Sequence, residues 1–233
     1  MNLFKSKIDA DKAVIHNVII LDRSGSMDSI RQQAVGGVNE TLQSIRVQQR
    51  ENPEVTHLVT LVAFCGCNMQ KIYRDTPIEK TRDLTPADYI PCCTTPLYDA
   101  IGTTITALHT QITGNPAKSA SVTIITDGYE NASREFDFNT ISRLIAQYKQ
   151  EGWLFAYIGA DHDVEKVAIN LHIDHSMRFN KTEDGTRDMF RRERQARKEW
   201  SDKMAQLMKD RDNLSHEELM QLKRRINTEY FDE

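Results

Sequence analysis

The sequence predicts an α/β fold: a doubly wound, mostly parallel sheet of six strands with one antiparallel edge strand, helices on both faces and a helical C-terminal extension. Short runs rich in Val, Ile and Leu alternate with longer segments whose apolar residues recur every three or four positions. The short runs are apolar almost without interruption, which is typical of parallel strands that are covered on both faces. Gly, Pro and Asn separate the two kinds of segment.

The first half of the chain supplies three predicted strands and one long helix. The first strand is the run at 14–21, and an amphipathic helix follows until Asn52-Pro53 ends it. The apolar face of this helix is formed by Ile30, Ala34, Val38, Leu42 and Ile45. Residues 56–64 form the second strand, and residues 69–74 return beside it as a short strand. This returning strand is the predicted antiparallel edge of the sheet.

The second half completes the sheet and its helical layers. Pro96 fits the first turn of a helix whose apolar face runs over 97–112. A later helix has Asn139 as its predicted N-cap. The remaining predicted strands are 121–126, 153–158 and a weak one at 177–179. All crossovers between parallel strands are expected to be right-handed.

The composition changes near residue 181, where strand patterns stop. From there to the C-terminus the chain holds 13 Lys and Arg and 13 Asp and Glu. Two helices are predicted, the second with a capping box formed by Ser215 and Glu218. We therefore expect an α/β domain over 1–182 and a charged helical extension over 183–233.

The bulk properties indicate a soluble protein with one core of ordinary size. The chain has 233 residues, a hydrophobic share of 39% and a formal net charge of −4, which argues against a general affinity for nucleic acid. The segment from Met1 to Lys7 lacks the apolar core of a secretory signal, and no apolar run is long enough to cross a bilayer. Four cysteines in two tight pairs do not indicate a secreted disulfide scaffold. We expect a cytoplasmic protein with no membrane contact.

Oxygen-bearing side chains follow two predicted strands and precede one helix. The first strand ends in Asp22-Arg23-Ser24-Gly25-Ser26, a later strand ends in Asp127-Gly128, and Thr94-Thr95 precede the helix that starts at Pro96. In a doubly wound sheet, ligands bind where carboxyl ends of strands meet at a switch point. Carboxylates and hydroxyls are the ligands that hard cations prefer. The sequence therefore predicts a divalent-metal site, with Mg²⁺ as the expected ion and Mn²⁺ or Ca²⁺ as alternatives.

These motifs resemble those of the von Willebrand factor A (vWA) family. The segment at 22–26 matches the family's DxSxS motif, 95–101 resembles its threonine loop and following helix, and 126–128 resembles its aspartate turn. The resemblance covers roughly 14–179 and implies a metal-ion-dependent adhesion site, called MIDAS, as in stand-alone bacterial or phage-type members. It implies direct metal ligands and, in addition, two aspartates that act mainly through water. The direct ligands would be Ser24, Ser26 and Thr95, and the aspartates would be Asp22 and Asp127.

One departure from the family pattern concerns the threonine loop. Cys93-Thr94 stand where many bacterial members have two glycines, so Thr94 becomes a rival to Thr95. Thr95 is preferred because it directly precedes Pro96, as in the family.

The predicted function is metal-dependent protein binding, in which the bound ion captures an Asp or Glu of a partner protein. The helical extension is a second candidate contact surface, for a partner helix. Two alternatives remain open at this point: a metal-dependent phosphoesterase, and a regulatory adaptor subunit of an AAA+ ATPase complex. The chain lacks a Gly-rich phosphate loop and a G-x-S-x-G motif, so we do not expect an enzyme.

The four cysteines allow a thiol cluster beside the metal site. Cys65 and Cys67 follow the second strand, and Cys92 and Cys93 lie in the loop before the threonines. Their spacing fits the usual zinc-finger patterns poorly, so we expect free, partly buried thiols rather than a zinc site or a redox pair.

Overall fold

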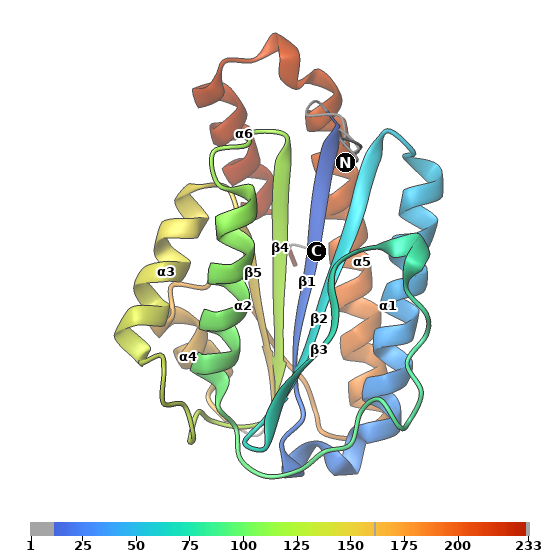
Figure 1. The fold of residues 1–233 in the computed structure, drawn as a ribbon, viewed down its shortest axis with the longest axis vertical. Helices are drawn as coiled ribbons and strands as arrows, with labels where there is room; N and C mark the ends of the chain where they lie inside the picture. The colour runs from blue at the N-terminus through green and yellow to red at the C-terminus, as the bar shows by residue number, and fades with distance from the viewer. Residues whose placement is uncertain (1–11, 161, 232–233) are drawn as a thin grey trace, which may run out of the picture.

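The computed structural model describes residues 12–160 and 162–231, and they form a six-stranded sheet with helices on both sides (Figure 1). The strand order is β3-β2-β1-β4-β5-β6, and only β3 runs antiparallel to its neighbour. The strands are β1 (Ala13–Asp22), β2 (Val55–Cys65), β3 (Asn68–Pro77), β4 (Lys118–Thr126), β5 (Leu154–Gly159) and β6 (His175–Arg178). The predicted fold class is confirmed. The polar N-terminal segment from Met1 to Lys7 lies outside the described residues.

Six α-helices and three short 3₁₀ segments accompany the described strands. The α-helices are α1 (Arg31–Glu51), α2 (Leu97–Ile112), α3 (Phe138–Gln150), α4 (Val164–Asn170), α5 (Glu183–Asp210) and α6 (His216–Thr228). The 3₁₀ segments are η1 (Gly25–Ile30), η2 (Ile78–Lys80) and η3 (Arg211–Asn213). Within the described ranges, no helix is long and apolar enough to cross a lipid bilayer.

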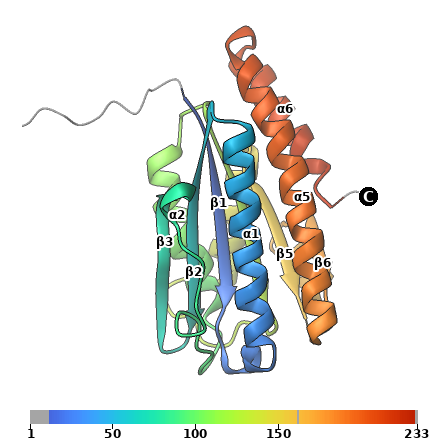
Figure 2. The ribbon, with the colours of Figure 1, turned by 90° about the vertical axis from the view of Figure 1, so that its right-hand side faces the viewer.

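The two faces of the sheet are covered by different helices, as Figures 1 and 2 show. Successive strand residues point to opposite faces, so Val18 and Ile20 of β1 pack with α2, α3 and α4, whereas Ile19 and Leu21 pack with α1. All ten residues of β1 are buried. This two-sided burial explains why β1 is a continuous apolar run rather than an alternating one.

Helix α5 lies on the same face as α1 and shares its core (Figure 2). Near its middle, Arg197 and Glu193 form a fully buried ion pair, and Arg197 also donates hydrogen bonds to Thr123 of β4 and Asn17 of β1. These bonds satisfy the guanidinium away from water. The helical extension that was expected from residue 183 therefore begins with a helix that covers part of the sheet.

Helix α6 follows α5 and packs beside the amino ends of the strands (Figure 1). The predicted capping box is present, because Ser215 and Glu218 exchange side-chain to backbone hydrogen bonds. The buried Lys223 donates to the carbonyls of Pro116 and Lys118, which lead into β4. The extension thus contacts the sheet along α5 and at the chain's entry to β4.

The predicted N-cap of α3 is wrong. Asp137, not Asn139, is the capping residue, and its carboxylate accepts a hydrogen bond from the Thr140 backbone N–H at 2.8 Å. Asn139 is the second residue inside the helix. Both residue types cap helices well, so composition alone does not decide between neighbouring candidates.

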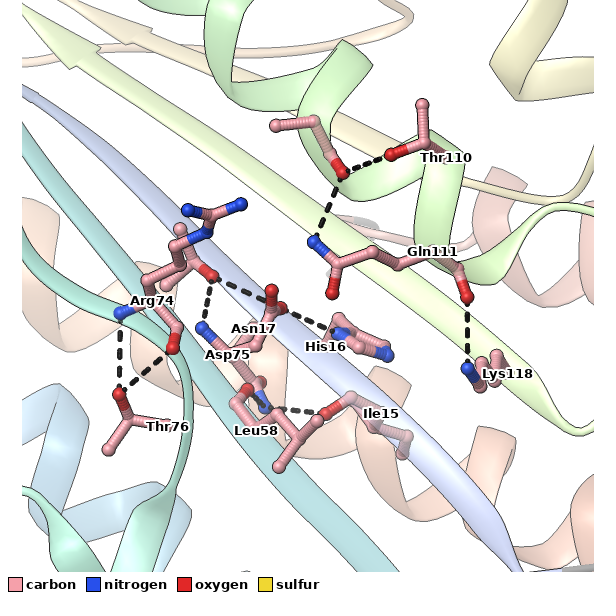
Figure 3. Close-up of polar contacts among 12 residues, drawn as sticks. Ile15, His16, Asn17, Leu58, Arg74, Asp75, Thr76, Thr110, Gln111 and Lys118 are labelled. Atoms are coloured by element: carbon pink, nitrogen blue, oxygen red, sulfur yellow. Dashed lines mark hydrogen bonds and ion pairs between the residues drawn. The ribbon is translucent and has the colours of Figure 1, made fainter. Parts of the chain in front are cut away.

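A group of polar side chains, from His16, Thr60 and Asp75, links β1 and β2 to the edge strand β3. Figure 3 shows the Asp75 carboxylate reaching His16, with Asp75 Oδ1 3.2 Å from His16 Nδ1. The backbone N–H of Asp75 donates to the Thr60 hydroxyl of β2, next to a register shift between β2 and β3. The hydrogen bond with His16 holds the pKa of Asp75 below its usual value. This group therefore anchors the edge strand far from the strand ends where the metal site is predicted.

The sheet has its topological switch point between β1 and β4. These two strands are neighbours, and the chain continues from β1 toward β2 and from β4 toward β5, in opposite directions. Asp22 is the last residue of β1, and Asp127 directly follows β4. The carboxyl ends of the two strands lie together at the lower end of the sheet in Figure 1. The fold therefore brings both predicted aspartates to the place where such sheets bind ligands.

Candidate metal centre

Asp22 is fully buried and fixed by hydrogen bonds to both carboxylate oxygens. Oδ1 accepts from the Ser24 backbone N–H at 2.7 Å, and Oδ2 accepts from the Thr126 hydroxyl at 2.6 Å. Burial raises the pKa of Asp22 to about 6, although the bonds from Thr126 and Ser24 oppose this shift. A nearby cation would stabilise the ionised form of such a desolvated carboxylate.

A chain of hydrogen bonds joins the first strand end to the fourth. Ser24 Oγ lies 3.1 Å from Ser26 Oγ, and Ser26 Oγ donates to Asp127 Oδ1 at 2.6 Å. The turn into η1 places both serines on the same side of the loop after Asp22. Asp127 is buried, so its contact with Ser26 lies away from bulk water. The two predicted motifs, far apart in the chain, are therefore in direct contact.

The threonine loop is tied to the aspartate turn by Asn131. The Thr95 backbone N–H donates to Asn131 Oδ1 at 2.8 Å, and the Asn131 backbone N–H donates to the Thr95 carbonyl at 3.1 Å. A β-carbon placed on Gly128 would lie 3.8 Å from Thr95 Oγ1, whereas one on Gly66 would lie 2.1 Å from Thr94 Oγ1. Thr95 therefore faces the turn after Asp127, and Thr94 faces the loop after β2.

Two further acidic residues hold the same loops in place. Glu130 accepts a hydrogen bond from the Tyr98 backbone N–H in the first turn of α2. The carboxylate of Asp99 accepts three backbone N–H groups of the loop before α3. Sequence reasoning missed Asn131, Glu130 and Asp99. The sequence did contain a clue to the two acidic residues. Asp99 lies near a helix start and Glu130 follows Gly128, and carboxylates at such places accept hydrogen bonds from unpaired backbone N–H groups.

Lys181 supplies a positive charge to the site. Its Nζ lies 2.6 Å from Asp127 Oδ2, and it comes from the segment between β6 and α5. Sequence reasoning did not identify this residue either, because nothing in its neighbourhood links it to the aspartate turn. The ammonium group offsets the negative charge of the buried Asp127 carboxylate.

The donor set fits a hard divalent cation. The structure gathers two buried carboxylates, from Asp22 and Asp127, with the hydroxyls of Ser24 and Ser26, and Thr95 lies beside the same turn. All donors are oxygens, which suits Mg²⁺, Mn²⁺ or Ca²⁺ better than zinc. The ammonium of Lys181 supplies positive charge at this site, as such an ion would.

The four cysteines are free in the structure, as expected, but they also gather at one place. Cys65, Cys67 and Cys92 lie close together, and Cys93 lies next to them. The hairpin turn between β2 and β3 meets the loop before α2 at this point. The spacing of the cysteines in the sequence could not predict this proximity, because spacing does not show how closely two distant loops approach.

Comparisons with known proteins support the fold. Neither the family models nor the curated proteins contain a match to this chain. Among solved structures, the SpRpn10 VWA domain is 15% identical, with a TM-score of 0.51, over 76% of this chain and 93% of that domain. The pilus adhesin SpaC from Lactobacillus rhamnosus GG is 13% identical, with a TM-score of 0.57, over 80% of this chain.

The D319A mutant of the PilB minor pilin from Streptococcus sanguinis is 13% identical, with a TM-score of 0.52, over 82% of this chain. This chain spans only 62% of that pilin and 30% of SpaC. At such low identities the likeness concerns the fold. The chain therefore has the α/β fold of a vWA domain, as its three motifs predict.

Proposed function

We propose that this protein is a divalent-metal-dependent protein-binding module of the MIDAS type. In this proposal Mg²⁺ is the expected ion, and the partner is a protein that presents an Asp or Glu side chain. The observation that carries the proposal is the direct contact of Ser26 with Asp127, which joins two motifs more than a hundred residues apart.

Each residue has a distinct part in this proposal. The hydroxyls of Ser24, Ser26 and Thr95 would hold the ion directly, and Asp22 and Asp127 would act mainly through water. Few anionic groups would then bind the ion directly, so it would supply an electrophilic centre for an incoming carboxylate. Thr126 and Asn131 position Asp22 and Thr95 through hydrogen bonds and need not touch the ion.

The geometry around Asp22 favours binding over phosphoryl transfer. Both of its carboxylate oxygens are engaged, one by the Ser24 N–H and one by Thr126, and the side chain is buried. A nucleophilic aspartate needs an oxygen free to attack and an acid or base nearby. Ser24, two residues later, cannot act as that acid or base at ordinary pH.

Metal titration of the purified protein tests the proposal. Isothermal calorimetry with Mg²⁺ and Mn²⁺ is expected to show one binding event that disappears in Asp22→Ala. Asp28→Asn removes an exposed carboxylate from the same loop and serves as the matched control. Undiminished metal binding by Asp22→Ala, with folding verified by circular dichroism, would contradict the proposal.

Partner capture tests the second half of the proposal. The immobilised protein is expected to retain a partner in Mg²⁺ and to release it in a chelator, and Asp22→Ala is expected to retain none. The captured partner is then expected to lose binding when its contacting Asp or Glu is changed to Asn or Gln. Capture that ignores both chelator and Asp22→Ala would show that the metal is not used for binding.

A further inference from the structure

The four cysteines form a compact group, here called the thiol cluster: Cys65, Cys67, Cys92 and Cys93. The Sγ atoms of the first three all lie within 4.8 Å of one another, and those of Cys65 and Cys92 are 3.0 Å apart. The Cys93 thiol lies close enough to those of Cys67 and Cys92 to raise their pKa values, although it lies outside this group of three. Three thiols from two separate loops therefore face one another, and the fourth lies beside them.

Backbone contacts hold the two loops together independently of the sulfur atoms. The Gly66 N–H donates to the Thr94 carbonyl at 2.8 Å, and the Cys92 N–H donates to the Arg23 carbonyl at 2.9 Å. Any side chain at Gly66 would collide with Thr94, so glycine permits this close approach. The thiol cluster is thus preorganised by the fold.

The size of the thiol cluster suits one tetrahedral metal ion. Zinc binds thiolates at about 2.3 Å, which places neighbouring sulfurs of a tetrahedron about 3.8 Å apart. Three of the four sulfurs, those of Cys65, Cys67 and Cys92, already lie within 4.8 Å of one another. The Cys93 side chain would turn toward them to complete the tetrahedron. Soft thiolate ligands select zinc over the hard ions that suit the neighbouring oxygen site.

The surroundings also favour a bound zinc ion. Four thiolates around Zn²⁺ carry a net charge of −2, and the Arg23 guanidinium donates to Cys65 Sγ at 3.3 Å. Hydrogen bonds of this kind are the usual support around metal ligands. Cys67 and Cys93 are exposed, which leaves the ion a path from solvent.

We propose that the thiol cluster is a structural zinc site, in which one Zn²⁺ is held by four thiolates whose protons are released to solvent. The site is separate from the oxygen donors of the proposed MIDAS, and it does not depend on the function proposed above. It would clamp the hairpin after β2 to the threonine loop, next to the Asp22 segment, where the Gly25 N–H also donates to the Cys93 carbonyl.

Metal analysis of the full chain tests the site. Protein purified under reducing conditions and passed through a desalting column is expected to carry one zinc ion per chain. Cobalt replacement is expected to give the visible and near-ultraviolet bands of a tetrahedral ion with four sulfur ligands. Cys67→Ser and Cys93→Ser change exposed positions and are each expected to lose the zinc and the cobalt spectrum.

Asp22→Ala is the matched control, because it removes the oxygen site and is expected to keep the zinc. Reduced protein that binds no zinc on reconstitution, whether its thiols are free or reoxidise to disulfides, would overturn the proposal. A Cys93→Ser variant that keeps zinc with an unchanged cobalt spectrum would overturn the four-thiolate assignment. Zinc that is lost in Asp22→Ala but kept in Cys67→Ser would place the ion at the oxygen site instead.

Discussion

At the scale of single residues, Lys181 is the most informative side chain of the metal centre. Its ammonium group lies on Asp127 Oδ2, a carboxylate that the proposed ion needs, directly or through water. A bound cation and Lys181 would therefore compete for the same negative charge. Lys181 lies just before α5, so the C-terminal extension begins next to the site.

We predict that Lys181→Met strengthens metal binding. A partly exposed ion pair contributes on the order of 1 kcal/mol, which corresponds to about fivefold in affinity. Calorimetric titration with Mn²⁺ measures the change, and Lys166→Met, at an exposed lysine outside the site, is the control. Equal or weaker Mn²⁺ binding by Lys181→Met would show that the lysine assists the ion instead of competing with it.

The residues of the site divide into those that sequence reveals and those that it does not. Asp22, Ser24, Ser26, Thr95 and Asp127 form local patterns at strand ends, so they could be named before the structure was known. Whether they bind a metal stays a prediction. Thr126, Asn131 and Lys181 act through contacts between distant segments, and such contacts leave no local pattern.

At the scale of elements, the packing of α1 against α5 depends on one glycine. A β-carbon on Gly37 of α1 would lie 2.1 Å from Phe190 of α5, whereas one on Gly36 would meet nothing within 4 Å. Gly37 therefore allows the Phe190 ring to lie against the α1 backbone. This contact lies near the amino end of α5 and helps to fix the helix on the sheet.

We predict opposite effects of alanine at these two neighbouring glycines. Gly37→Ala should destabilise the protein by about 1–3 kcal/mol because Phe190 must move. Gly36→Ala should stabilise it by about 0.5–1 kcal/mol because alanine favours the helix and has room. Urea unfolding measures both changes. Similar effects for the two variants would show that Phe190 does not pack against α1 in solution.

The elements themselves could be predicted better than their packing. Strands β1, β2, β4 and β5 follow from short apolar runs, because strands buried on both faces typically have that pattern. The apolar stripe of α5 predicts a helix with one buried side. It does not say whether that side meets the sheet or another protein, and the structure shows that it meets the sheet.

At the scale of the whole molecule, the apolar core consists of three clusters, one on each face of the sheet and a third where α5 and α6 meet the amino ends of the strands. His57 of β2 is a buried polar residue of the sheet, with Asn17 Nδ2 3.4 Å from its Nδ1. Burial lowers the pKa of His57 to about 4. Nearby Asp202 opposes this shift, and nearby Arg197 adds to it. Stability therefore depends on pH through a group far from the metal centre.

The sign of this dependence follows from the proton count of each state. Between pH 6.5 and about 4 the unfolded chain protonates His57 and the folded chain does not, so stability falls as pH falls through this window. A shift of this size amounts to about 3 kcal/mol when the window is crossed completely. Above pH 6.5 both states hold the neutral imidazole, and His57 contributes no pH dependence.

We predict that His57→Gln removes this part of the acid sensitivity. Urea unfolding of wild type should show a loss of stability between pH 7 and about 4.5 that exceeds the loss in His57→Gln by roughly 2 kcal/mol. Carboxylates titrate in the same range, but they are common to both proteins and cancel in the difference. The exposed His216→Gln is the matched control and should behave as wild type. If His57→Gln and wild type lose stability equally, the imidazole is protonated inside the folded protein, and the sheet must open to water around β2 at mildly acidic pH.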